Sequence, residues 1–201
     1  MPDGPAAVAP ERAPRRTRVV IIGSESTGKT TLAERLAAHY AAPLASEFVR
    51  RYANAKRAPL DASDVEPIAR GQLAVEDEAV AVAGSHDGGL VIFDTDLNST
   101  VVYARHYYGA CPAWIDEAAR ARRADLYLLL DIDVPWIADP QRDRGSRRPE
   151  MHALFRNRLA EISARRLEIS GGWDERFAQA IAAIDELRER SDVAAHPRRR
   201  D

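Results

Sequence analysis

The chain has 201 residues, a formal net charge of −2 and 45% hydrophobic residues, a composition that suits one domain with a substantial core. These values exclude a disordered chain, and such a balanced charge is not typical of nucleic-acid-binding proteins. No stretch approaches the roughly 20 apolar residues that cross a bilayer, so we expect no membrane partner. The only cysteine, Cys111, excludes an intrachain disulfide, and we expect a cytoplasmic protein.

The two ends of the chain differ from its middle. Residues 1–16 are rich in Ala and Pro and lack the apolar segment of a secretory signal, so we interpret them as a disordered leader. Residues 191–201 include three consecutive arginines and are interpreted as a disordered basic tail. Residues 17–190 carry no internal repeat and no linker, and we expect them to form one domain. The sequence does not indicate an oligomeric state.

Short apolar runs predict strands at five places in this domain. The clearest runs are Arg18–Ile22, Leu90–Phe93 and Leu126–Leu130, and the weaker ones are Pro43–Ser46 and Arg166–Ile169. Helical patterns separate them. This alternation predicts an α/β fold, with a parallel five-stranded sheet covered by helices on both faces.

The helical patterns have recognisable boundaries. One pattern has a capping box, Ser63-x-x-Glu66, and a proline in its first turn, and it runs to about Ala83 before a glycine-rich loop. The other predicted helices are Thr31–Tyr40, Asn98–Tyr108, Ala113–Arg122, Pro149–Ser163 and Trp173–Arg190.

The strongest motif follows the first strand, where Gly23-Ser24-Glu25-Ser26-Thr27-Gly28-Lys29-Thr30 has the spacing of a P-loop. In such a loop, glycines allow a tight turn and backbone amides surround a phosphate chain at a helix N-terminus. The motif therefore predicts a site for ATP and Mg²⁺. Lys29 would contact the terminal phosphates and the Thr30 hydroxyl would be a metal ligand. The predicted ATP-binding residues are Gly23, Ser24, Glu25, Ser26, Thr27, Gly28, Lys29, Thr30, Thr31 and Arg148.

Acidic residues follow three other predicted strands, at Glu47, at Asp94-Thr95-Asp96 and at Asp131-Ile132-Asp133, and in parallel sheets ligands bind at the carboxyl ends of the strands. Asp94 ends an apolar strand as a metal-binding carboxylate does, although it could instead cap the next helix. Asp96 fits an N-cap and a substrate contact equally well. Glu47 fits a catalytic carboxylate that orients and deprotonates an acceptor hydroxyl, or an ion pair with a neighbouring arginine.

An arginine-rich segment, Gln141–Arg148, lies between two predicted helices. Arginines on a closing lid would neutralise charge that develops during phosphoryl transfer, and Arg142 is the predicted catalytic arginine. The alternative is an exposed basic loop. Trp136 lies just before this segment and either stacks on a planar ring or belongs to the core.

The motif order resembles the ribosylnicotinamide kinase domain of the NadR family and the P-loop ATPases grouped with it. The resemblance covers about residues 17–190. The segments that carry it are the P-loop, Ser46-Glu47-Phe48-Val49-Arg50-Arg51-Tyr52, Phe93-Asp94-Thr95-Asp96, and Pro135-Trp136-Ile137-Ala138-Asp139 followed by Arg142.

The resemblance implies a nucleoside kinase-like P-loop fold with an arginine-rich lid, and ATP-dependent phosphorylation of the 5′-hydroxyl of nicotinamide riboside. It implies that Glu47, Asp96, Trp136 and Asp139 contact this substrate. NadR proteins also carry a DNA-binding domain and an adenylyltransferase domain, and since only residues 1–16 come before the first strand here, we expect neither activity. Two alternatives remain open: a nucleotide-dependent switch, and a kinase for another nucleoside or nucleotide.

Overall fold

The structure is a computed structural model that describes residues 16–84, 89–134 and 147–195. A five-stranded parallel sheet has the order β2-β3-β1-β4-β5, as the sequence predicts for the fold class. The strands are β1 (Thr17–Ile22), β2 (Leu44–Ala45), β3 (Leu90–Asp94), β4 (Leu126–Leu130) and β5 (Arg166–Ile169). All five predicted strands are confirmed, with the weakest apolar run reduced to two residues in β2.

The helices are α1 (Lys29–Tyr40), α2 (Phe48–Lys56), η1 (Ala62–Asp64), α3 (Val65–Ala83), α4 (Leu97–Tyr108), α5 (Ala113–Ala121), α6 (Arg148–Glu161) and α7 (Trp173–Ala195). The sequence patterns do not predict α2, a helix of nine residues none of which is fully buried. Helix α7 continues five residues beyond its predicted end at Arg190.

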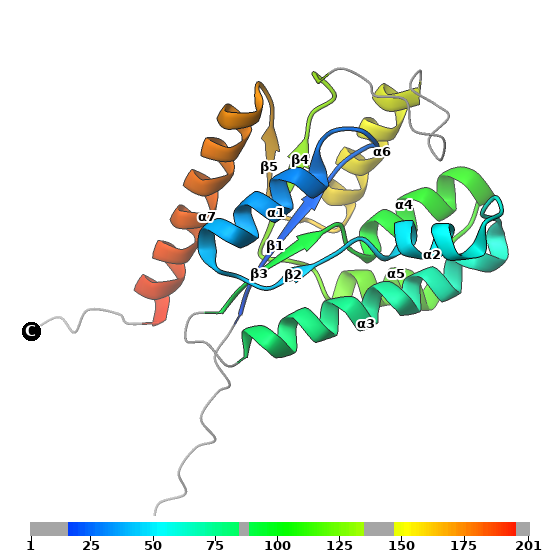
Figure 1. The fold of residues 1–201 in the computed structure, drawn as a ribbon, viewed down its shortest axis with the longest axis horizontal. Coiled ribbons are helices and arrows are strands. Elements are labelled where there is room, and N and C mark those ends of the chain that lie inside the picture. The colour runs from blue at the N-terminus through cyan, green and yellow to red at the C-terminus, as the bar shows by residue number, and fades with distance from the viewer. Residues whose placement is uncertain (1–15, 85–88, 135–146, 196–201) are drawn as a thin grey trace, which may run out of the picture.

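Helices cover both faces of the sheet. Along β1, Val19 and Ile21 pack with residues of α1 and α7, while Val20 and Ile22 pack with residues of α3, α4 and α6. This alternation follows from the two-residue period of a strand. Figure 1 shows α1 and α7 on one side of the sheet and the other large helices on the opposite side. The central strand β1 is thus buried on both faces, and it ends where the P-loop begins.

The capping box predicted at Ser63 and Glu66 is wrong. The structure places the box two residues earlier, between Asp61 and Asp64 at the start of η1. The Ser63 amide donates to Asp61 Oδ1 (2.8 Å), and the Asp61 amide donates to Asp64 Oδ2 (2.7 Å). Because Asp61 and Asp64 cap the 3₁₀ turn, Glu66 takes no part in the box. It lies on the exposed surface of α3 and pairs with Arg70.

A carboxylate is buried between α3 and the sheet. Glu76 is 1% exposed, and its Oε2 lies 3.4 Å from both Arg18 and Arg122. Burial and the nearby Asp96 carboxylate together raise the pKa of Glu76 to about 7, because the two arginines only partly offset these effects. The folded protein therefore holds a proton on this group more tightly than the unfolded chain does.

This shift predicts a loss of stability with rising pH. Below pH 4.5 Glu76 is protonated in both states, and between pH 4.5 and about 7 the folded state alone keeps the proton. Over that window this group should lower the free energy of unfolding, by up to about 3 kcal/mol. Urea unfolding at pH 5 and pH 8 should show a smaller pH effect in Glu76→Gln than in the wild type. Two results would contradict this role of Glu76: an equal pH effect on the free energy of unfolding in the wild type and in Glu76→Gln, or an equally reduced pH effect in the exposed control Glu78→Gln.

Candidate active site

The P-loop adopts the tight turn that its glycines predict. Gly23 and Gly28 have φ values of +146° and +85°, which side chains disfavour. A Cβ on Gly23 would lie 3.0 Å from the Leu130 carbonyl oxygen, so the loop passes close to the end of β4. Helix α1 begins directly after Gly28, and the free amides of its first turn face the loop.

Two side chains of the loop bond across its interior. Lys29 Nζ and Thr27 Oγ1 each donate to the Ser24 carbonyl oxygen at 2.9 Å. Ser24 and Thr27 are buried, whereas Glu25 and Ser26 are half-buried on the loop and Thr31 is exposed on α1. The ammonium group of Lys29 therefore lies over the concave side of the loop, where an anion would be received.

The structure brings Thr30 and Asp94 together. Thr30 Oγ1 donates to Asp94 Oδ2 at 2.7 Å, although the two residues are 64 positions apart. Asp94 is 2% exposed, and its Oδ1 has no hydrogen-bond partner within the described residues. Burial raises the pKa of Asp94, while the Thr30 hydrogen bond and the charge of Lys29 oppose the rise. Asp94 does not cap the next helix, so that alternative is wrong.

Asp96 caps α4. Its Oδ1 accepts the Asn98 amide at 2.9 Å, and its Oδ2 accepts Tyr127 Oη and Asn98 Nδ2, each at 2.8 Å. The residue is 5% exposed, and burial raises the pKa of its carboxyl. The N-cap alternative is confirmed, and a contact between Asp96 and a substrate stays a prediction.

Glu47 lies between β2 and α2, at the same edge of the sheet as Asp94. Its Oε2 is 3.5 Å from Arg50 Nε, and its side chain is 18% exposed. The Glu47 charge is close enough to raise the pKa of Asp94. The predicted ion pair with an arginine is confirmed, and a part of the Glu47 side chain remains open to solvent.

Arg148 lies beside the P-loop, at the start of α6. Its Nη1 donates to the Val134 carbonyl oxygen (3.0 Å) and its Nη2 to that of Ser26 (3.5 Å). The predicted lid residue Arg142, and the predicted substrate contacts Trp136 and Asp139, fall within 135–146 and so lie outside the described residues.

Arg176 of α7 is a loop contact that sequence patterns did not indicate. The residue is 1% exposed, and its guanidinium donates to the carbonyl oxygens of Thr27 (3.1 Å), Asp131 (3.2 Å) and Gly171 (2.8 Å) and pairs with Asp133. It thereby ties the P-loop to the ends of β4 and β5. The sequence offers one weak indication of this role: Arg176 lies in the first turn of a helix that follows Gly171 and Gly172.

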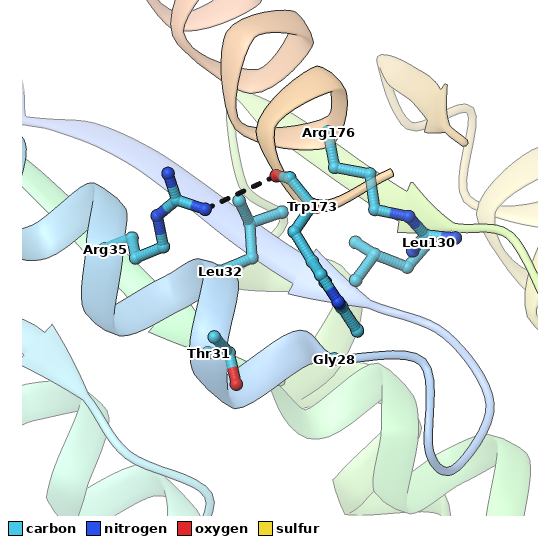
Figure 2. Close-up of a pocket in the computed structure, with 7 residues that line it drawn as sticks. All are labelled: Gly28, Thr31, Leu32, Arg35, Leu130, Trp173 and Arg176. Carbon is cyan, nitrogen blue, oxygen red and sulfur yellow. Dashed lines mark hydrogen bonds between the residues drawn. The ribbon is translucent and has the colours of Figure 1, made fainter. Parts of the chain in front are cut away.

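Trp173, at the start of α7, covers the outer side of the P-loop. Figure 2 shows its ring beside Gly28, with Arg35 of α1 bonded to its carbonyl oxygen. A Cβ on Gly28 would lie 2.3 Å from the ring, so this position requires glycine for space as well as for backbone angle.

Removing the Arg176 guanidinium should loosen the P-loop. We expect Arg176→Met to lower the free energy of unfolding by about 2 kcal/mol, because buried carbonyl oxygens lose their donor. We also expect weaker ATP binding, since the loop carbonyl of Thr27 is no longer held. Urea unfolding and calorimetry would measure the two effects. The exposed Arg190→Met on the same helix is the control, and equal stability of the two variants would argue against this role.

A family model described as an AAA domain matches residues 18–176. The chain belongs to this family. None of the helices in the described ranges combines the length and the apolar character needed to cross a bilayer.

Known relatives give a more specific likeness. The chain is 30% identical over 176 residues to the trifunctional NAD biosynthesis/regulator protein NadR of Escherichia coli (strain K12), which covers 84% of the chain and 42% of that protein. A crystal structure of NadR in complex with NR matches at a TM-score of 0.74 and 27% identity, over 86% of this chain and 50% of that one. A crystal structure of NadR in complex with NAD and AMP-PNP matches at a TM-score of 0.69 and 29% identity, over 87% of this chain and 50% of that one. The chain is therefore related to NadR but spans about half of its length.

Proposed function

We propose that this protein is an ATP-dependent kinase that phosphorylates the 5′-hydroxyl of nicotinamide riboside. The observation that carries the proposal is the Thr30–Asp94 hydrogen bond beside Lys29, with Glu47 at the same edge of the sheet. Phosphoryl transfer requires a phosphate cradle, a metal position and an acceptor carboxylate together. The NadR structures with NR and with AMP-PNP support both proposed substrates.

Thr30 and Asp94 fit a magnesium ion. Their donors are a hydroxyl and a carboxylate oxygen, which Mg²⁺ prefers, and the ion usually keeps several waters as further ligands. Asp94 Oδ1 is buried without a hydrogen-bond partner among the described residues, as expected of an oxygen that a cation or its water would satisfy. When bound, the ion would neutralise charge on the phosphates.

Glu47 would act on the acceptor. Its carboxylate accepts the proton of the 5′-hydroxyl, the hydroxyl oxygen forms a bond to the γ-phosphorus, and the bond from that phosphorus to the oxygen of ADP breaks. The products are ADP and nicotinamide mononucleotide. Arg50 Nε lies 3.5 Å from Glu47 Oε2 and would help to orient this carboxylate.

Lys29, Arg148 and the loop amides would hold ATP. Lys29 would neutralise charge on the terminal phosphates, and Arg148, which donates to the Ser26 carbonyl oxygen, would add a second positive charge beside the loop. Arg142 remains the proposed lid arginine, and Trp136, Asp139 and Asp96 the proposed substrate contacts.

Acceptor-dependent release of ADP tests this function. Purified protein with ATP and Mg²⁺ should release ADP rapidly when nicotinamide riboside is added, and mass spectrometry should detect nicotinamide mononucleotide. Faster turnover with another nucleoside would assign a different acceptor to the same chemistry. A low ATPase rate that no nucleoside in a panel stimulates would overturn the kinase proposal in favour of a nucleotide-dependent switch.

A further inference from the structure

Helix α2 obtains a hydrogen bond for its first amide from another helix. The first amides of a helix have no partner within it, and an acidic residue at the helix start often accepts one of them. Glu47 occupies the N-cap position of α2 but makes no such bond. Instead, the Phe48 amide donates to Gln72 Oε1 of α3 at 3.0 Å.

The neighbouring glycine of α3 makes room for this contact. A Cβ on Gly71 would lie 2.1 Å from the Phe48 ring, so the ring packs directly on the backbone of α3. Gln72 is 3% exposed, and its Nε2 has no hydrogen-bond partner within the described residues. The bond from the Phe48 amide to Gln72 Oε1 therefore offsets a part of the cost of burying this polar side chain.

The far end of α2 is also fixed to the start of α3. Tyr52 Oη donates to Asp64 Oδ1 at 2.9 Å, and Lys56 pairs with Asp61 and Asp64. Helix α2 therefore runs antiparallel to the first half of α3 and beside it (Figure 1). Gln72 holds the end that carries Glu47, and Asp64 holds the opposite end.

We propose that Gln72 is a positioning residue for the acceptor carboxylate. By capping α2 from α3, it fixes the backbone at Phe48, so that the Glu47 carboxylate does not have to accept an amide of its own helix. This inference rests on the proposed function, because Glu47 is a catalytic residue only if the protein is a kinase. A displacement of about 1 Å at a reacting group costs up to about 100-fold in rate, so a lost cap should act on catalysis.

Kinetics of two Gln72 variants test this role. Gln72→Met keeps the size but removes the acceptor oxygen, and kcat for nucleoside phosphorylation should fall about 10- to 100-fold. The KM for ATP should stay within about twofold, because the P-loop is untouched. Gln72→Glu keeps an acceptor oxygen, and burial favours the protonated, uncharged form of the new carboxyl, so this variant should retain most of the activity. The control Tyr52→Phe loosens the far end of α2, and it should lower thermal stability while leaving kcat near normal.

Amide exchange of Phe48, followed by NMR, tests the cap without using activity. Protection of this amide should be lost in Gln72→Met and kept in Gln72→Glu and Tyr52→Phe. Unchanged protection or unchanged kcat in Gln72→Met would overturn the proposal. If the wild type transferred phosphate to no nucleoside, the proposed function would fall and the catalytic role of Gln72 with it, while the exchange data would still decide whether Gln72 caps α2.

Discussion

Lys29→Ala is expected to lower phosphoryl transfer by about 100-fold or more, as the loss of a charge-stabilising donor commonly does. Lys29 Nζ lies over the P-loop, where it donates to the Ser24 carbonyl oxygen, and it starts the helix whose free amides face the same space. The variant removes the mobile positive charge that would follow the terminal phosphate through transfer. Steady-state ADP release with saturating nucleoside would measure the loss.

The chain contains one other lysine, which provides a matched control. Lys56 ends α2 and pairs with Asp61 and Asp64. We expect Lys56→Ala to reduce stability and leave transfer nearly unchanged. Near-normal transfer by Lys29→Ala would refute the role given to Lys29.

Glu47→Gln is expected to abolish most transfer while leaving ATP binding largely intact. A general base contributes about 100- to 10,000-fold, and glutamine is isosteric with glutamate but does not accept the acceptor proton. The substitution leaves the P-loop and the Thr30–Asp94 pair in place. Transfer kinetics, together with calorimetry of a non-hydrolysable ATP analogue, would separate chemistry from binding.

A structural role of Glu47 would give a different pattern. Its carboxylate pairs with Arg50, so a purely structural residue should show lowered thermal stability in Glu47→Gln with transfer retained. Glu66→Gln is the control, because it breaks another glutamate–arginine pair on a helix surface, with Arg70. An exposed pair of this kind contributes at most about 1 kcal/mol.

Several parts of the fold follow from local sequence. The strands were found because parallel strands buried on both faces are continuous apolar runs, as at Leu126–Leu130. The Thr30–Asp94 pair was anticipated because the P-loop motif and an apolar strand ending in aspartate each fix a position at the same sheet edge.

Other parts depend on contacts that no local pattern contains. Local sequence does not predict helix α2, because residues of neighbouring elements, Gln72 and Asp64, hold its two ends. It does not indicate the role of Arg176 either, because the partners of Arg176 are mainly backbone carbonyl oxygens, which have no sequence signature. The prediction of the capping box is wrong because Ser63-x-x-Glu66 has the usual sequence pattern, whereas the box that forms uses Asp61 and Asp64, which do not have it.

Calorimetric titration with AMP-PNP tests the central claim most directly, namely that the loop from Gly23 to Thr30 receives a nucleoside triphosphate with its magnesium. The account predicts saturable binding in the presence of Mg²⁺, weakened when the metal is chelated and weakened again in Thr30→Val. Absence of any heat of binding for both ATP and GTP analogues with Mg²⁺ present would contradict the nucleotide site and every catalytic role built on it.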